Sequence, residues 1–261
     1  MKFCQFMRPG YFGSPSPEYG LIEDEGLVMI QGAPWSAWQR ASPGHITEDL
    51  PLLAPVNPGK IVCVGRNYAA HAAELGNEVP KEPLLFLKPP SSLLAPKGTV
   101  RLPAISNRVD YEGELGIVIA RRCHKIGPDE DVRPYIRGYV CVNDVTARDI
   151  QKSDGQWTRG KGFDTFCPVG PIVSDEIDPA GGSPVTVITR LNGAVKQQAS
   201  TRDLIFPIAD LLRYITQTMT LEPGDLIPTG TPAGVGAVKP GDRIQIEIDG
   251  LGILENEFAA E

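Results

Sequence analysis

Two glutamates on one predicted strand are the residues whose chemistry is most evident in this chain. Glu112 and Glu114 lie in Tyr111-Glu112-Gly113-Glu114-Leu115-Gly116-Ile117-Val118-Ile119, where residues alternate as in a half-buried strand. Their side chains therefore share one face, and the opposite face carries Tyr111, Leu115, Ile117 and Ile119. Two like charges this close repel each other, and partial burial strengthens the repulsion. The pair therefore predicts a bound cation.

Asp144 is the candidate for a third carboxylate ligand. It follows the apolar run 139–142, at the end of a predicted strand, where a rigid scaffold can present a functional group. Three carboxylates without a neighbouring His or Cys ligand form a hard oxygen site, suited to magnesium, manganese or calcium rather than zinc. Spacing alone leaves an alternative open, in which Asp144 only caps the turn or helix that follows.

His71 and Glu74 form a candidate acid–base pair. They are three residues apart within 65–76, so they share one face of a helical turn. A carboxylate beside an imidazole raises its basicity and fixes its orientation, as a general base requires. The alternative is an exposed pair on a surface turn. The turn-rich residues 76–83 that follow suit either a mobile lid or a simple loop.

Other polar groups are candidates for holding an anionic substrate. Lys161 can bind a substrate carboxylate or an enolate oxygen, and the alternative is a solvated surface lysine. Arg148 and Gln151 lie on a predicted short helix, where Arg148 is expected to be a structural ion-pair residue. The Gly-rich segment 228–236 lacks the Lys-Ser/Thr ending of a phosphate loop. Its N–H groups and Thr231 can still bind a carboxylate.

Short strands are the main elements available to position these groups. Strands are predicted at 2–7, 27–31, 60–65, 84–87, 137–142, 243–248 and 251–255. Asn192-Gly193, between the runs 185–191 and 194–197, is a strong hairpin signal. A helix is predicted after Pro207, with one apolar face that contains Ile208, Leu211, Leu212, Ile215 and Met219. Many strands with few helices predict an α+β, β-rich fold with a rolled or sandwiched mixed sheet.

A Pro-rich connector at 50–59 divides the chain into two predicted parts. Residues 1–57 contain short strands and turns without sustained helical periodicity, which predicts a small β-rich N-terminal domain and linker. Residues 58–261 form the predicted catalytic domain. The 261 residues are enough to bury a substantial core.

Composition argues against several classes of function. The formal net charge is −7 without an evident basic patch, so nucleic acid is not an expected partner. No apolar run approaches the ~20 residues that cross a bilayer, and the N-terminus is too polar for a signal peptide. The five cysteines are widely spaced without a CxxC pair, which predicts free thiols in a reducing cytoplasm rather than a zinc site.

Taken together, these segments resemble the fumarylacetoacetate hydrolase family. The resemblance runs from about residue 60 to 258. It rests on four blocks that occur in the order expected for the family: residues 64–68 together with 71 and 74, then 111–115, then 143–149, and then 229–232. It implies three metal ligands, Glu112, Glu114 and Asp144. It implies three catalytic residues, His71, Glu74 and Lys161. It also implies four substrate-binding residues, Arg66, Tyr68, Gln151 and Thr231.

The resemblance also implies a fold, an assembly and a class of substrate. The expected fold is a mixed β-sheet roll, and the expected assembly is a homodimer. Family members act on small 2-oxo or 2-hydroxy acids with a bound Mg²⁺ or Mn²⁺. The N-terminal segment resembles the small leading domain of two-domain bacterial members, of the 2-hydroxyhepta-2,4-diene-1,7-dioate isomerase and acylpyruvase type.

The implied chemistry is a metal-stabilised enolate, which is compatible with three reactions. The metal chelates the 2-oxo carboxylate end of a small dicarboxylic acid, and Lys161 adds positive charge nearby. Water activated by Glu74 and His71 gives C–C bond hydrolysis, a proton shift along a dienol gives isomerisation, and loss of carbon dioxide gives an oxaloacetate decarboxylase. The alternative of another class is a non-catalytic, ligand-binding member of the family. Such a member would be expected to lose His71, Glu74 or Lys161, and all three are present.

Overall fold

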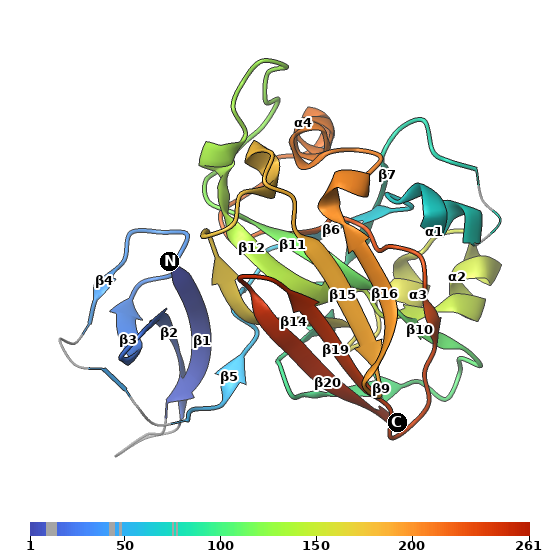
Figure 1. The fold of residues 1–261 in the computed structure, drawn as a ribbon, viewed down its shortest axis with the longest axis horizontal. Helices are drawn as coiled ribbons and strands as arrows, with labels where there is room; N and C mark the ends of the chain where they lie inside the picture. Colours follow the sequence, from blue (N-terminus) through green and yellow to red (C-terminus); the bar gives the residue numbers. More distant parts are fainter. Residues whose placement is uncertain (9–14, 42–44, 47–48, 75, 77) are drawn as a thin grey trace.

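The computed structural model describes residues 1–8, 15–41, 45–46, 49–74, 76 and 78–261, and Figure 1 shows its course. Strands dominate it, and both parallel and antiparallel pairs occur, which confirms the predicted α+β, β-rich fold with mixed sheets. The described strands form sheets of twelve, five and three members.

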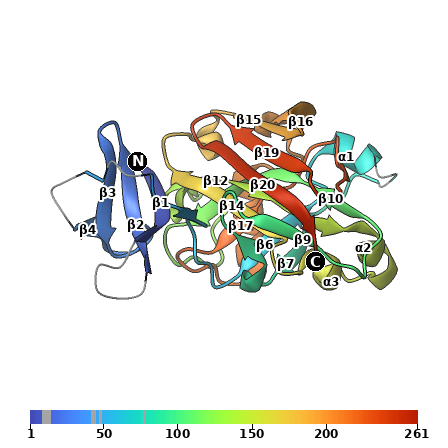
Figure 2. The same cartoon turned by 90° about the horizontal axis from the view of Figure 1, so that it is seen from below.

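Strands from residues 1–57 extend the largest sheet at one end. They are β1 (Lys2–Arg8), β2 (Ser16–Glu23), β3 (Gly26–Gln31), β4 (Gln39–Arg40) and β5 (Leu52–Leu53). Figures 1 and 2 show them set to one side of the remaining strands. β1 nevertheless pairs antiparallel with β14 (Cys167–Ser174), through Phe3 opposite Val173. The sheet is therefore continuous across the predicted boundary at 57/58, and the division into two domains stays a prediction.

The central strands of this sheet carry the candidate metal ligands. From β14 the order continues with β12 (Ile136–Asn143), β11 (Gly113–Ile119), β17 (Leu226–Pro228), β6 (Ile61–Gly65) and β7 (Leu84–Lys88), and the short β8 (Leu93–Leu94) pairs with β14. β17 and β6 are parallel, whereas β11 runs antiparallel to both β12 and β17. This arrangement brings the ends of β6, β11 and β12, which are far apart in the sequence, into neighbouring positions.

Two smaller sheets complete the fold. The five-stranded sheet contains β16 (Ala194–Ser200), β15 (Thr186–Leu191), β19 (Arg243–Ile248), β20 (Gly252–Ala260) and β9 (Thr99–Leu102). The three-stranded sheet contains β13 (Thr146–Ala147), β10 (Val109–Tyr111) and β18 (Gly236–Ala237). β15 and β16 form the predicted hairpin, and Asn192 and Gly193 both have positive φ, as a tight hairpin turn requires.

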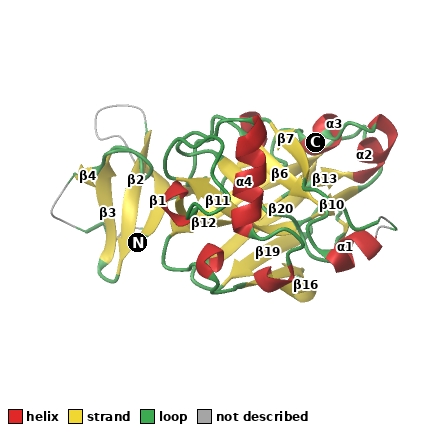
Figure 3. Ribbon diagram, turned by 90° about the horizontal axis from the view of Figure 1, so that it is seen from above, coloured by secondary structure: helices red, strands yellow, loops and turns green. Residues whose placement is uncertain are grey.

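The described helices are short, and one of them closes the main core. They are α1 (Ala69–Glu74), α2 (Arg148–Asp154), α3 (Thr158–Lys161) and α4 (Ile208–Thr218), with single 3₁₀ turns at Pro90–Ser92, Arg133–Tyr135, Pro179–Gly181 and Thr201–Asp203. α4 is the predicted late helix, and Figure 3 shows it lying over β11 and β12. Its apolar face packs with β11, β12 and the five-stranded sheet in one hydrophobic cluster.

The strand that carries the glutamates differs from the prediction in two ways. It is broken at Glu112, because β10 belongs to the three-stranded sheet and β11 to the largest one. It is also buried on both faces rather than half-buried. Leu115 and Ile117 face the cluster under α4, while Val118 faces a second cluster that includes Phe3 and other residues of the N-terminal strands. The expectation of one solvated face was wrong, because the face that carries the charges also packs into this second hydrophobic cluster.

Two further expectations from composition can be compared with the structure. All five cysteines are buried with free thiols. Among the described residues, no helix combines the length and apolar character that crossing a membrane requires. Residue 77 of the predicted lid, and Leu75 beside it, lie outside the described residues.

Packing of α4 leads to a prediction about stability. Leu211 is fully buried in the main cluster, so Leu211→Ala leaves a cavity there. We expect the free energy of unfolding to fall by about 2–5 kcal/mol. Gln217→Ala, at an exposed position of the same helix, is the matched control and should change it by less than about 0.5 kcal/mol. Denaturant unfolding of both variants measures this, and equal effects would contradict the role assigned to α4.

Candidate active site

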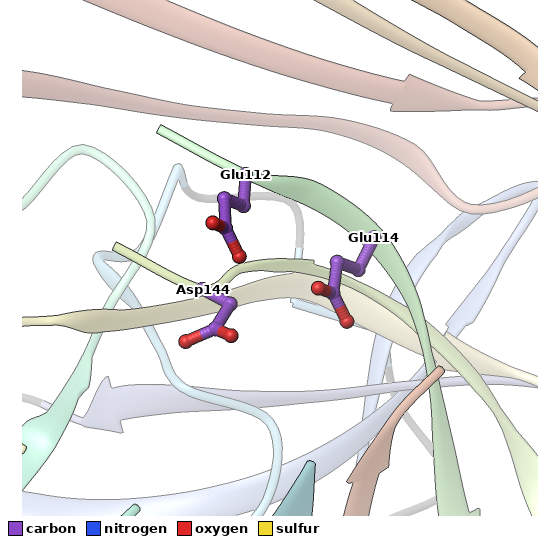
Figure 4. A group of neighbouring side chains, drawn as sticks. All are labelled: Glu112, Glu114 and Asp144. Atoms are coloured by element: carbon purple, nitrogen blue, oxygen red, sulfur yellow. The ribbon is translucent and has the colours of Figure 1, made fainter. Parts of the chain in front are cut away.

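Three carboxylates meet where β11 and β12 end side by side. Gly113 pairs with Asn143 at the end of the ladder, so Glu112 and Asp144 come next on their chains and lie opposite each other. The Asp144 N–H donates to the Glu112 carbonyl at 2.9 Å, and the Asn143 side chain accepts from the Glu112 N–H at 3.0 Å. Glu114 follows two residues along β11 on the same face. One oxygen from each carboxylate lies within 4.8 Å of the others, as Figure 4 illustrates.

Buried cations compensate two of these carboxylates. The Lys161 ammonium donates to Glu112 at 2.7 Å and also to Asp144. Lys88 donates to the other Asp144 oxygen at 2.7 Å, and Arg148 donates to Glu112 at 2.6 Å. All three cationic side chains are at most 5 % exposed. Such charges are retained in an interior only as hydrogen-bonded pairs, so these contacts form one ionic network.

The network shifts the pKa values of its members in opposite directions. Burial raises the pKa of Glu112, but the charges of Lys161 and Arg148 outweigh it and hold the pKa well below the usual range. Burial lowers the pKa of Lys161, yet Asp144 and Glu112 reverse this and raise it. The lysine is therefore a charged ammonium at neutral pH.

Glu114 is the member of the triad that lacks such compensation. Burial, followed by the negative charges of Asp144 and Glu112, raises its pKa well above the usual range. The Gly230 N–H donates to one of its oxygens at 2.8 Å, and no described lysine or arginine pairs with it. A divalent cation between the three carboxylates would supply the missing charge. Oxygen-only ligands fit Mg²⁺ or Mn²⁺, so Glu112, Glu114 and Asp144 suit the metal that the sequence predicts.

His71 and Glu74 lie on α1, beside this network. His71 Nδ1 is buried without a hydrogen-bond partner and lies 3.5 Å from a Glu74 oxygen, an ion-pair distance rather than a hydrogen bond. Burial lowers the pKa of His71, and Glu112 and Glu74 offset this only in part. The imidazole is therefore neutral at neutral pH, the form that accepts a proton.

The turn before α1 places Arg66 at the entrance of the site. Arg66 directly follows β6 and has φ +56°, a left-handed conformation that is uncommon for a residue with a side chain. Its guanidinium lies 5.7 Å from the ring centre of Trp157. A Cβ on Gly65 would lie only 2.6 Å from the same ring, so Trp157 can pack here only against glycine. Within the described part of the chain, Arg66 has no carboxylate partner.

A cavity of about 330 Å³ joins most of the predicted site residues. The predicted residues that line it are Arg66, His71, Glu112, Glu114, Asp144, Gln151, Lys161 and Thr231. Glu74 contacts His71 but does not line the cavity. Tyr68 is buried in the main hydrophobic cluster instead and also does not line the cavity. The roles given to all of these residues stay predictions, and Tyr68 would need a rearrangement to reach a ligand.

Comparison with known proteins identifies the family. The family described as fumarylacetoacetate (FAA) hydrolase, C-terminal, matches residues 60–259. The chain belongs to the fumarylacetoacetate hydrolase family. The match begins one residue before β6 and covers every residue of the candidate site. Named family members are hydrolases, isomerases and tautomerases, and this protein is an enzyme of the same family.

Three relatives illustrate the similarity. The structure of 5-carboxymethyl-2-hydroxymuconate delta-isomerase from Mycobacterium smegmatis is 37% identical, with a TM-score of 0.88 over 100% of both chains. The structure of 2-hydroxyhepta-2,4-diene-1,7-dioate isomerase from Mycobacterium marinum is 39% identical, with a TM-score of 0.86 over 100% of this chain and 99% of that one. Oxaloacetate tautomerase Fahd2a, mitochondrial, from Rattus norvegicus is 41% identical over 215 residues, 79% of this chain and 68% of the relative.

Sequence analysis missed two residues that position the site. Lys88 is the last residue of the apolar strand β7 and is fully buried against Asp144. The sequence signal that could have identified it is a lone lysine at the end of an apolar strand. Asn67 is also fully buried, and its amide donates to the carbonyls of Thr229 and Phe206. It thereby ties the turn before α1 to the Gly-rich loop. Arg148 is the ion-pair residue that was expected, contacting Asp110, Glu112 and Gln151.

The uncompensated state of Glu114 leads to a prediction about metal binding. Glu114→Gln keeps an acceptor for the Gly230 N–H but removes one of the three negative ligands. We expect Mn²⁺ affinity, measured by isothermal titration calorimetry, to fall at least about 10-fold. Without metal, the free energy of unfolding should stay within about 1 kcal/mol of wild type, because a neutral amide replaces a buried carboxyl whose pKa is already raised.

A surface substitution is the control for that measurement. Glu130→Gln changes an exposed carboxylate that pairs with Tyr135 and does not line the cavity. It should leave Mn²⁺ affinity unchanged. Wild-type affinity in Glu114→Gln would rule out Glu114 as a ligand.

Proposed function

We propose that this protein is a divalent-metal-dependent enzyme that moves a proton on small 2-oxo or 2-hydroxy dicarboxylic acids through an enolate, as in isomerisation of 2-hydroxyhepta-2,4-diene-1,7-dioate. One observation carries this proposal: a neutral imidazole, a buried ammonium and a carboxylate triad all line the same small cavity. A base and an electrostatic stabiliser facing one space are what proton abstraction next to a carbonyl requires.

The triad would hold the metal, and the chain's own residues would do the rest. A bound Mg²⁺ or Mn²⁺ would supply the Lewis acid that polarises a 2-oxo acid. Lys161 supplies further positive charge at the same end of the cavity, and its contacts with Glu112 and Asp144 hold it there. Its fixed orientation means that little reorganisation is needed when negative charge develops on the substrate.

His71 is the residue that we propose transfers the proton. It lines the cavity as a neutral imidazole, and Glu74 lies on its far side. When the ring takes a proton from substrate carbon, the Glu74 carboxylate stabilises the resulting imidazolium. The same ring can return the proton to a different carbon or to oxygen, which accounts for isomerisation and for tautomerisation with one base.

Two further cations that line the cavity, and do not pair with the triad, support a substrate with a second carboxylate. Arg66 and Lys152 both line the cavity, together with Trp157. Arg66 is held over the Trp157 ring and has no described carboxylate partner, so its guanidinium is available to a ligand. A carboxylate is the group that a guanidinium binds best. We therefore assign the distal carboxylate of the substrate to Arg66, with Lys152 beside it.

The names of relatives support proton-transfer chemistry. The two full-length structural relatives described above are named as isomerases of an unsaturated hydroxy tricarboxylate and an unsaturated hydroxy dicarboxylate, and the rat relative is named an oxaloacetate tautomerase. Each name describes a shift of hydrogen next to a 2-oxo or 2-hydroxy group. The rat relative favours oxaloacetate as a second candidate substrate, through enol–keto conversion on the same site. Acylpyruvate hydrolysis and oxaloacetate decarboxylation are the competing reactions.

Assembly and location complete the proposal. We propose a homodimer in the cytoplasm that binds a small acid and neither nucleic acid nor membrane. The negative net charge and the free buried thiols are compatible with this. Size-exclusion chromatography with light scattering tests the dimer.

A substrate panel with metal removal tests the reaction. The purified protein is assayed with 2-hydroxyhepta-2,4-diene-1,7-dioate, oxaloacetate and acylpyruvates. We expect isomerisation or tautomerisation with Mg²⁺ or Mn²⁺, loss of activity with a chelator, and recovery when metal is restored. Full activity after chelation would contradict the metal dependence. Turnover of acylpyruvates alone would make the enzyme a hydrolase, and carbon dioxide release from oxaloacetate would make it a decarboxylase.

The distal carboxylate is tested by Arg66→Gln. A hydrogen bond to a charged group contributes about 1.5–3 kcal/mol, so KM for a dicarboxylate should rise about 10- to 100-fold. KM for an analogue without the distal carboxylate should not change. Arg159→Gln is the control, because Arg159 is exposed, pairs with Asp154 and does not line the cavity. An equal rise in KM for both kinds of substrate would refute the assignment.

A further inference from the structure

Glu74 is fixed by the backbone of a distant loop. About a third of its side chain is exposed, yet both of its oxygens lie 3.1 Å from the Gly234 nitrogen and accept from the same N–H. Gly234 belongs to the Gly-rich loop 229–235, which joins β17 to β18. This contact turns the Glu74 carboxylate towards His71 rather than towards solvent.

The backbone of Gly234 is itself held in place. Its φ of +104° lies in the region that favours glycine, and a Cβ at this position would lie only 2.0 Å from the Lys196 carbonyl oxygen. The Gly234 carbonyl accepts from the Tyr111 hydroxyl at 2.8 Å. Tyr111 is buried at the end of β10, where it pairs with Gly236 on β18. Gly234 thus receives a hydrogen bond from Tyr111 and donates one to Glu74.

The same loop also contacts the metal triad. The Gly230 N–H donates to Glu114 at 2.8 Å, and the Thr231 hydroxyl donates to the Gly113 carbonyl at 3.0 Å. Tyr111 is covalently joined to Glu112. The loop 229–235 therefore connects the acid–base pair on α1 to Glu114 on β11, although the two lie about 40 residues apart in the sequence.

We propose that Tyr111 is a positioning residue for proton transfer: by anchoring Gly234 through its carbonyl, it keeps the Gly234 N–H in place to hold Glu74 beside His71. This inference rests on the proposed function, in which His71 carries the proton. Without the hydroxyl, the Gly234 carbonyl loses its partner and Gly234 gains freedom to move. The exposed Glu74 then turns to solvent, and the imidazole loses the charge that stabilises its protonated form.

The kinetic test is Tyr111→Phe, which removes one oxygen atom. We expect kcat to fall roughly 10-fold, as for loss of a group that orients a functional side chain. KM and Mn²⁺ affinity should stay within about twofold of wild type, because Arg66 and the triad keep their contacts. A double-mutant cycle identifies the route of the effect. In a Glu74→Gln background, Tyr111→Phe should cause no further loss of kcat, because the group it positions is already absent.

Tyr139→Phe is the matched control for loss of a buried hydroxyl. Tyr139 is as buried as Tyr111, its hydroxyl accepts from the Ala180 N–H at 3.4 Å, and it does not line the cavity. This variant should keep wild-type kcat. A kcat loss of the same size in Tyr139→Phe, or a full additional loss when Tyr111→Phe is added to Glu74→Gln, would overturn the positioning role.

A measurement without substrate separates this inference from the proposed function. The backbone amide proton of Gly234, observed by NMR in isotope-labelled protein, reports its hydrogen bond to Glu74. We expect it to move upfield in Tyr111→Phe and in Glu74→Gln, and to stay unchanged in Tyr139→Phe. An unchanged Gly234 amide in Tyr111→Phe would overturn the inference even if the enzyme turns over its substrate. The expected shift in a protein that turns over no substrate would refute only the proposed function.

Discussion

The structure depends on keeping three carboxylates together out of water. Glu112, Glu114 and Asp144 are each at most 4 % exposed. An isolated charge in such a place is prohibitively unfavourable, so each needs a partner. Lys88, Lys161 and Arg148 partner Glu112 and Asp144 and leave Glu114 without a cation. The network is therefore balanced for most of its charge and lacks a described cation at Glu114, where a divalent metal would supply the missing charge.

The layers of the fold serve this constraint. The central strands are covered on one side by α4 and the five-stranded sheet, and on the other by the second hydrophobic cluster. This packing buries the ladder up to Asn143. Glu114 lies within the ladder, and Glu112 and Asp144 lie one residue beyond its end. The cations come from three separate elements, β7, α2 and α3. Rigid elements thus surround the triad, and the Gly-rich loop links it to α1.

Much of the fold and site could be predicted because it depends on local pattern. Alternation predicted most strands, Asn192-Gly193 predicted the hairpin, and helical spacing predicted α4. Glu112 and Glu114 were predicted as a pair because like charges at a spacing of two must share a face, and Asp144 was predicted as their partner because it follows a strand. Lys88 was missed because nothing in its neighbourhood shows that its strand ends against Asp144. Tyr68 was assigned to the substrate, yet its ring lies in the core, because the turn at Arg66 directs it there.

The sequence by itself determined which chemical groups are present, how they are spaced along each strand or turn, and which family they belong to. It determined that Glu112 and Glu114 share a face and that His71 and Glu74 share a turn, because both follow from the periods of local structure. Only the tertiary structure decided that the face with the charges is buried, that Lys88 and Arg148 compensate it, and that Gly234 joins Tyr111 to Glu74. These contacts join residues from separate elements, and no local period specifies which elements meet.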